Sequence, residues 1–132
     1  MPTSLWSPTL SVGMPSMDTS HGELLDKLAC LLDVPDADFP AHYAAMVARV
    51  ESDFREEEDL MEKIDFPGLH HHREQHCALL GKLHRVAGAI MQGDVALGRQ
   101  TIAILPQWLV THISTWDAGL AFALQFRHEE IL

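Results

Sequence analysis

The sequence predicts an all-α protein, an antiparallel up-down four-helix bundle with an extended N-terminal arm and a short C-terminal helix. Apolar residues recur at intervals of three and four along several long segments, which is the spacing of one helix face. Prolines, glycines and aspartates separate these segments, and no stretch shows the sustained alternation of a β-strand. Helices joined by short connections pack as antiparallel neighbours. We therefore expect a single domain over residues 1–132, with the arm at 1–17 and the helical bundle at 18–132.

The arm and the first helix are predicted from the proline and leucine pattern. Three prolines and a glycine within residues 1–17 prevent a long helix there. The first helix is expected from about residue 20 to residue 32, with Asp18 or Thr19 as its N-cap. Its apolar stripe consists of leucines at helical spacing: Leu24, Leu25, Leu28, Leu31 and Leu32.

Three further long helices follow, each bounded by turn-forming residues. The second is expected over about 41–64, after a loop rich in proline and aspartate, and the third over about 69–91. The fourth is expected to run from about 94 to 116 or beyond, and Pro106 inside it should kink the helix or mark a joint. Residues 118–132 form the expected short C-terminal helix.

Charge, hydropathy and cysteine pattern indicate which partners and which cellular location to expect. A net charge of −10 argues against nucleic acid, which needs a concentrated basic surface, and against an anionic membrane surface. No apolar run approaches the roughly 18 residues of a spanning helix, and the N-terminus lacks the pattern of a signal peptide. Cys30 and Cys77 form no CxxC motif and are expected to be reduced packing residues. The expected location is the cytoplasm.

Residues that commonly bind metals form an ordered series over four expected helices. Two pairs in the series have i,i+4 spacing and so share a helix face, and bundles build metal sites from facing helices. Imidazole and carboxylate without thiolate suit iron, manganese or zinc. The candidate metal ligands are His21, Asp53, Glu57, His72, His76, His112 and Asp117. The last two are five residues apart, about 140° on a regular helix, so both face inward only if they straddle the core-facing stripe or if the helix is distorted.

Several neighbouring polar residues have a functional and a purely structural interpretation. The run at 55–59 is either a second set of acidic ligands or, as we expect, a solvated face from which only Glu57 points inward. His70 and His71 are expected at a solvated helix start rather than as spare ligands. Asp18 either orients His21 or caps the helix.

The candidate ligands and their flanking motifs resemble the hemerythrin family, specifically its single-domain bacterial members. The matching segments are Trp6-Ser-Pro-x-Leu-Ser-Val-Gly13, Asp18-x-x-His21, Phe54-Arg-Glu-Glu-Glu-Asp-Leu-Met61, Phe66-Pro-Gly68, His72-x-x-x-His76 and Trp108-Leu-x-x-His-Ile-x-x-x-Asp117. The resemblance implies two non-heme iron ions inside the bundle, bridged by two carboxylates and an oxo or hydroxo group, with dioxygen as the ligand.

The resemblance also implies a role for each candidate. Glu57 and Asp117 would be the bridging carboxylates, and His21 would bind the iron that takes up dioxygen. Three histidines would complete the other iron: His72, His76 and His112. The family has a further histidine ligand where this chain has Asp53. Four aromatic residues either line an oxygen pocket or serve the core alone: Phe54, Trp108, Trp116 and Phe122.

Asp53 leaves more than one function open. If it binds iron, its charge stabilises ferric iron and favours irreversible oxidation; if it does not, the second iron has an extra open position and weaker retention. We expect a dioxygen carrier, store or sensor rather than an enzyme. The alternatives are a di-iron oxidase or peroxidase, and a binding module that has lost one or both irons. The expected partner is dioxygen or a related small molecule, with no nucleic acid or membrane, and the expected state is a monomer.

Overall fold

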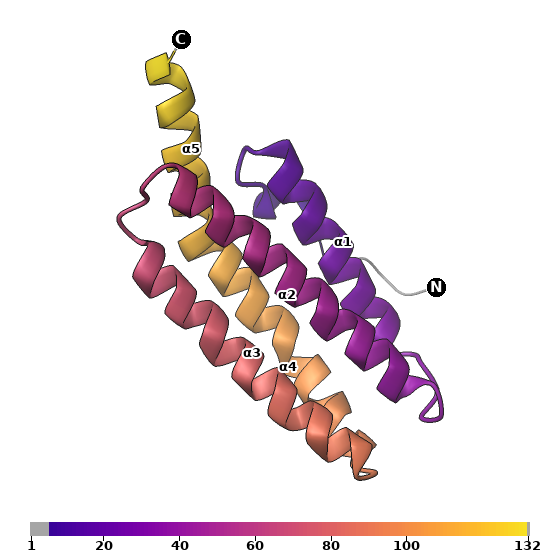
Figure 1. Cartoon of the computed structure of the whole chain (residues 1–132). Helices are drawn as coiled ribbons and strands as arrows, with labels where there is room; N and C mark the ends of the chain where they lie inside the picture. Colours follow the sequence, from indigo (N-terminus) through magenta and orange to yellow (C-terminus); the bar gives the residue numbers. More distant parts are fainter. Residues whose placement is uncertain (1–5, 132) are drawn as a thin grey trace.

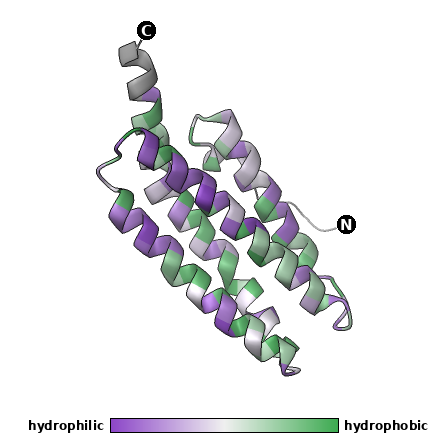
Figure 2. Ribbon diagram, viewed as in Figure 1, coloured by the Kyte–Doolittle hydropathy of each residue, from purple (hydrophilic) through white to green (hydrophobic). Residues whose placement is uncertain are grey.

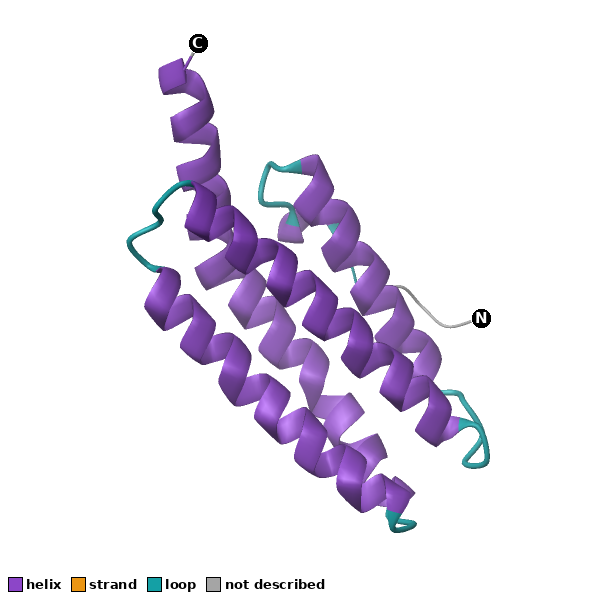
Figure 3. Ribbon diagram, viewed as in Figure 1, coloured by secondary structure: helices purple, strands orange, loops and turns teal. Residues whose placement is uncertain are grey.

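The computed structural model describes residues 6–131, with side chains described for residues 6–125, and is helical without strands over this range (Figure 3). The α-helices are α1 (Pro15–Leu31), α2 (Phe39–Lys63), α3 (Leu69–Met91), α4 (Val95–His112) and α5 (Ala118–Ile131). A 3-10 turn, η1, covers Pro8–Leu10, and a π-helical turn, η2, covers Ile113–Asp117. Helices α1 to α4 form an antiparallel up-down bundle, and α5 continues the line of α4 beyond its end (Figure 1). The predicted fold class is confirmed.

The start of α1 differs from the prediction. The helix begins at Pro15, five residues early, because proline is accepted in the first turn of a helix, where its N–H would have no partner. Asp18 is therefore not an N-cap. Its carboxylate accepts hydrogen bonds from the Val12 backbone N–H at 2.9 Å and the Ser11 hydroxyl at 2.6 Å, which tie the preceding segment to α1. The prediction of an extended arm to residue 17 was wrong both at η1 and from Pro15 onward.

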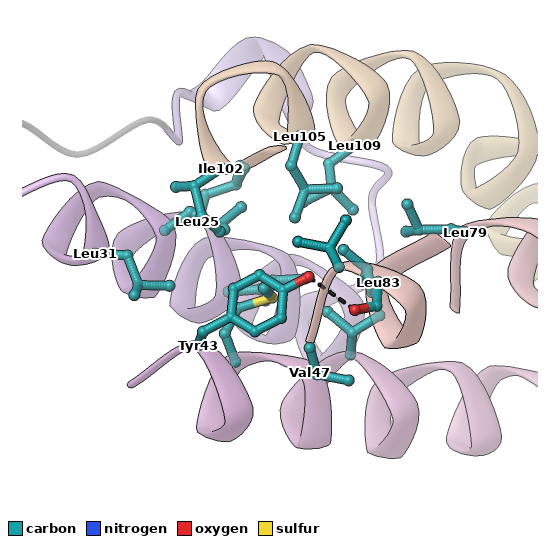
Figure 4. Packing of buried hydrophobic residues seen from close by; sticks show 14 of the residues in the cluster. Leu25, Leu31, Tyr43, Val47, Leu79, Leu83, Ile102, Leu105 and Leu109 are labelled. Carbon is teal, nitrogen blue, oxygen red and sulfur yellow. Dashed lines mark hydrogen bonds between the residues drawn. The ribbon is translucent and has the colours of Figure 1, made fainter. Parts of the chain in front are cut away.

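The main apolar cluster fills one half of the bundle, between α1, α2, α3 and α4 (Figure 4). Its buried members include Leu25, Leu31, Tyr43, Val47, Leu79, Leu83, Ile102, Leu105 and Leu109. Removing these side chains from water is the main favourable term in folding. The Tyr43 hydroxyl donates a buried hydrogen bond of 2.9 Å to the Leu83 backbone carbonyl, which links α2 to α3. The cluster and this hydrogen bond hold the helices together in this half of the bundle.

A second apolar cluster lies toward the other end of the bundle, with buried Met17, Met61, Leu120 and Ala121. The hydrophilic stretch of α2 lies toward its C-terminal end (Figure 2). Along the helices, buried polar side chains separate the residues of one cluster from those of the other. This polar layer contains the candidate ligands.

The cysteines differ from their predicted placement. Cys30 and Cys77 are free thiols, but both are exposed, so the prediction that they pack in the core was wrong. They lie on the solvent faces of α1 and α3, beside the buried stripes. Within the described chain, no helix has the length and apolar character needed to cross a membrane.

Candidate metal centre

Six of the seven candidate ligands converge in the polar layer. Ligand atoms of five of them lie within 4.8 Å of one another: Glu57, His72, His76, His112 and Asp117. His21 approaches from α1, with its Nε2 2.9 Å from Asp117 Oδ2. All six side chains are buried. The seventh candidate, Asp53, is only partly buried and points to a different partner.

Helical spacing accounts for most of this convergence. His21 lies four residues after buried Met17 and four before buried Leu25, so it occupies a core position of α1. His72 and His76 likewise continue the buried face of α3. The ligand positions are therefore core positions that carry imidazole or carboxylate in place of an apolar side chain.

The π-helical turn η2 brings the remaining pair together. His112 and Asp117 are five residues apart, and in a π-helix the hydrogen bonds join residues i and i+5. The Ala118 backbone N–H bonds to the Ile113 carbonyl in this manner. His112 Nε2 lies 3.1 Å from Asp117 Oδ1 as a result. A local distortion, one of the two possibilities left open by the sequence, is thus the one that occurs.

Each buried carboxylate spans from His21 to two of the three other histidines. Glu57 Oε1 lies 3.8 Å from His21 Nε2, whereas Glu57 Oε2 lies 3.4 Å from His72 Nε2 and 3.2 Å from His76 Nε2. Asp117 Oδ2 faces His21, whereas Asp117 Oδ1 lies 3.1 Å from both His72 Nε2 and His112 Nε2. Two carboxylates that each present one oxygen to either side can bridge two cations.

Three inner atoms are poorly matched as hydrogen-bond partners within the described chain. His76 Nε2 and His112 Nε2 lie 3.3 Å apart, so at most one of them donates to the other. Glu57 Oε2 is buried without a well-oriented hydrogen bond within the described chain. Because buried polar atoms are normally satisfied, a cation between these nitrogens and oxygens would supply the missing partner. The donor set therefore fits a metal site of imidazole and carboxylate character.

The same contacts shift the protonation of the cluster. Burial lowers the pKa of His21 and of His72, but hydrogen bonds to Asp117 and Glu57 outweigh burial and raise each pKa to about 9. Burial raises the pKa of Asp117, and hydrogen bonds from His112, His21 and His72 bring it well below its usual range. Without metal, His21 and His72 thus favour the imidazolium form beside Asp117 and Glu57, and a metal that binds through their nitrogens must displace protons.

Glu58 is a site residue that the sequence did not reveal. Its Oε2 lies 3.0 Å from His76 Nδ1, and its Oε1 accepts a hydrogen bond of 2.8 Å from Arg73 Nε. Burial raises the pKa of Glu58, but His76 and Arg73 bring it below its ordinary value. A carboxylate on the outer nitrogen of a ligating histidine fixes the ring and raises its basicity. Glu58 belongs to the acidic run that was expected to be solvated apart from Glu57, and no spacing rule would have distinguished it.

Asp53 is bound to Arg49, one turn earlier on α2. Arg49 Nε lies 3.0 and 3.2 Å from the two carboxylate oxygens of Asp53, and Arg49 Nη2 lies 2.6 Å from Glu23 on α1. Burial raises the pKa of Asp53, and the hydrogen bonds from Arg49 offset part of that rise. Asp53 also lines a cavity of about 90 Å³ together with His21 and Glu57.

Aromatic rings cover the histidines on their outer sides. Phe54 stacks on His76 with ring centroids 3.7 Å apart, and Trp108 stacks on His112 at 4.8 Å. Trp116 meets the His72 ring at a steep angle, at 5.9 Å. Phe122 is 71% exposed, so the suggestion that it lines a pocket or the core was wrong. His70 and His71 are solvated at the start of α3, as predicted.

Comparisons with known proteins agree with this geometry. The model of the hemerythrin HHE cation binding domain matches residues 12–123. A bacteriohemerythrin of Ralstonia nicotianae is 36% identical over 117 residues, which cover 89% of this chain and 85% of that protein. A myohemerythrin of Riftia pachyptila is 29% identical over 114 residues, which cover 86% of this chain and 87% of that protein.

Proposed function

Since the chain belongs to the hemerythrin family, we propose that it is a non-heme di-iron protein that binds dioxygen as a carrier, store or sensor. The observation that carries the proposal is the placement of the two buried carboxylates. Glu57 and Asp117 each direct one oxygen to His21 and the other to the group of three histidines. A site for a single ion would not need two carboxylates that span in this way.

The residues divide into two sets of ligands. One iron would be held by the nitrogens of His72, His76 and His112 together with one oxygen from each carboxylate. The other would be held by His21 and the two remaining oxygens of Glu57 and Asp117. Bound iron would supply the electrons that dioxygen binding requires, because protein side chains alone do not provide them.

The protein surroundings favour binding over turnover. Phe54 and Trp108 cover His76 and His112, and the apolar clusters on either side limit the contact of the polar layer with water to the cavity beside His21. Exclusion of water strengthens the electrostatic interactions inside such a site and suppresses side reactions. Glu58 contacts Nδ1 of His76, the nitrogen that faces away from the cluster, and so limits rotation of this ring while metal binds.

An optical spectrum tests this function directly. The iron-loaded protein is reduced without oxygen, and spectra are recorded before exposure to oxygen, after it and after degassing. A charge-transfer band that appears with oxygen and disappears on degassing is the expected result. Loss of the reduced form without recovery, or a spectrum without iron bands, would contradict reversible binding.

A second function, peroxide or oxygen reduction, is favoured by the cavity beside His21. This cavity is lined by the partly buried carboxyl group of Asp53 and reaches two candidate ligands, His21 and Glu57. A carboxyl group beside an open metal position can take part in the proton transfers that turnover of small oxidants needs. Steady consumption of peroxide with a reductant, suppressed by Asp53→His, would support this function. An Asp53→His variant with the same oxygen and peroxide behaviour as the wild type would exclude Asp53 as its cause.

A further inference from the structure

Arg49 occupies an unusual position next to the candidate metal centre. It lies on the same face of α2 as Asp53 and Glu57, so that Arg49, Asp53 and Glu57 follow one another at intervals of one turn. Its guanidinium group is anchored twice, to Asp53 through Nε and to Glu23 through Nη2. The side chains of Arg49 and Asp53 are 29% and 13% exposed, so the pair is largely shielded from water.

The bond between Arg49 and Asp53 decides where the aspartate points. Both carboxylate oxygens of Asp53 accept from Arg49 Nε, at 3.0 and 3.2 Å. The group of ligand atoms that lie within 4.8 Å of one another includes Glu57, one turn away on the same helix, but not Asp53. Asp53 nevertheless lines the cavity next to His21 and Glu57. It is therefore near the centre but turned toward the arginine.

We propose that Arg49 is a positioning residue that holds Asp53 away from the second metal, so that this metal has only three protein ligands and keeps positions open toward the cavity. The proposal rests on the di-iron function proposed above. The three ligands are His21, Glu57 and Asp117. The cavity of about 90 Å³ has room for a few water molecules or for a ligand of two or three atoms, which defines the size of molecule that these positions accept.

The physical basis is competition between two cations for one carboxylate. The Arg49 Nε–H is shared between the two oxygens of Asp53 and turns the carboxylate toward the arginine, so Asp53 must rotate and weaken this contact before an oxygen can reach the metal. Glu23 strengthens the arginine's hold, since it fixes the far end of the guanidinium group at 2.6 Å. Glu23 lies two residues from His21 on α1, so the same helix supplies both the metal ligand and the anchor of the competing cation.

A double-mutant cycle on Arg49 and Asp53 separates positioning from simple charge effects. The variants are Arg49→Met, Asp53→Asn and the double variant, with Arg55→Met as a matched control that removes an exposed arginine from the same helix. Each protein is titrated with ferrous iron without oxygen, and the rate at which a chelator removes the more weakly held iron is measured. Arg49 contributes partly exposed ion pairs, which are worth little to folding, so the variants should fold; circular dichroism checks this.

The expected result is tighter retention of the second iron in Arg49→Met, on the order of tenfold, because the freed aspartate becomes a ligand. Asp53→Asn alone and Arg55→Met should retain this iron nearly as the wild type does, and the double variant should lose the gain. If the gain persists in the double variant, it comes from the lost positive charge and the positioning role is refuted. Loss of the second iron in Asp53→Asn alone would show that Asp53 already binds it, which also refutes the inference.

The proposed function fails separately from this inference. If the wild type takes up no iron even in excess, the di-iron proposal fails and the inference falls with it. If the wild type takes up a pair of irons and Arg49→Met retains the second no better, only the inference fails.

Discussion

The contact between Glu58 and His76 offers a sharp test of how the centre is supported. Glu58 Oε2 lies 3.0 Å from His76 Nδ1, on the side of the ring opposite to the converging Nε2. Glu58→Gln keeps the shape and one acceptor oxygen but removes the charge. The variant should therefore bind metal more weakly while folding normally without it.

The size of the loss follows from the environment of the pair. A hydrogen bond to a charged group contributes roughly 1.5–3 kcal/mol, and loss of an outer-shell partner typically lowers metal affinity about 10- to 100-fold. The Glu58 side chain is 21% exposed and a glutamine still accepts a hydrogen bond, so the lower end applies. We expect a loss of about tenfold, which corresponds to about 1.4 kcal/mol.

Competition with a calibrated chelator measures this affinity. Asp59→Asn is the matched control, because Asp59 is the next residue of α2 and is exposed. Equal affinities for Glu58→Gln and the control would refute the idea that Glu58 supports the metal through His76. A collapse of the metal-free fold in Glu58→Gln would show instead that its role is structural.

Four further predictions concern proton release, the pH dependence of stability, metal removal and the core. With a pKa raised to about 9, His21 and His72 are each expected to carry a proton at neutral pH. Metal binding should therefore release about two protons, which calorimetry in buffers of different ionisation enthalpy measures. Release of no protons would contradict the ion pairs of these histidines with Asp117 and Glu57. Without metal, these pKa values lie above the unfolded value of 6.5, so their contribution to the free energy of unfolding should be complete below about pH 6.5 and be lost as pH rises through about 9. Removal of bound metal should lower Tm, since free metal at 100 times its Kd stabilises the fold by about 2.7 kcal/mol; an unchanged Tm on chelation would argue for a metal-poor module. Tyr43→Phe removes the buried bond to Leu83 and should lower the free energy of unfolding by about 1 kcal/mol, and an unchanged denaturation midpoint would show that the bond contributes nothing.

Helical spacing alone predicted much of the fold. The boundaries of α3 agree with the prediction, because its apolar stripe is regular and glycine lies beyond each end. The start of α1 could not be found in this way, since a proline both breaks helices and begins them. The contacts of Asp18 with Ser11 and Val12, which tie the preceding segment to α1, likewise have no signal in the helical spacing.

The inner part of the site was also accessible from the sequence, whereas its outer part was not. His72, His76 and Glu57 follow from position on a helix face, which is a local property. The π-helical turn before Asp117 depends on how the end of α4 packs, and the partners of Glu58 and Asp53 depend on neighbouring side chains rather than on spacing. Arg49 lies four residues before Asp53, a spacing that is common on solvated helix faces and carries no signal of function.

An iron titration followed by Mössbauer spectroscopy tests the central claim most directly. If Glu57 and Asp117 bridge two irons as proposed, uptake in excess iron should saturate at two ions per chain, and the oxidised pair should be magnetically coupled. Saturation at one uncoupled ion per chain, or no uptake, would contradict the dinuclear centre.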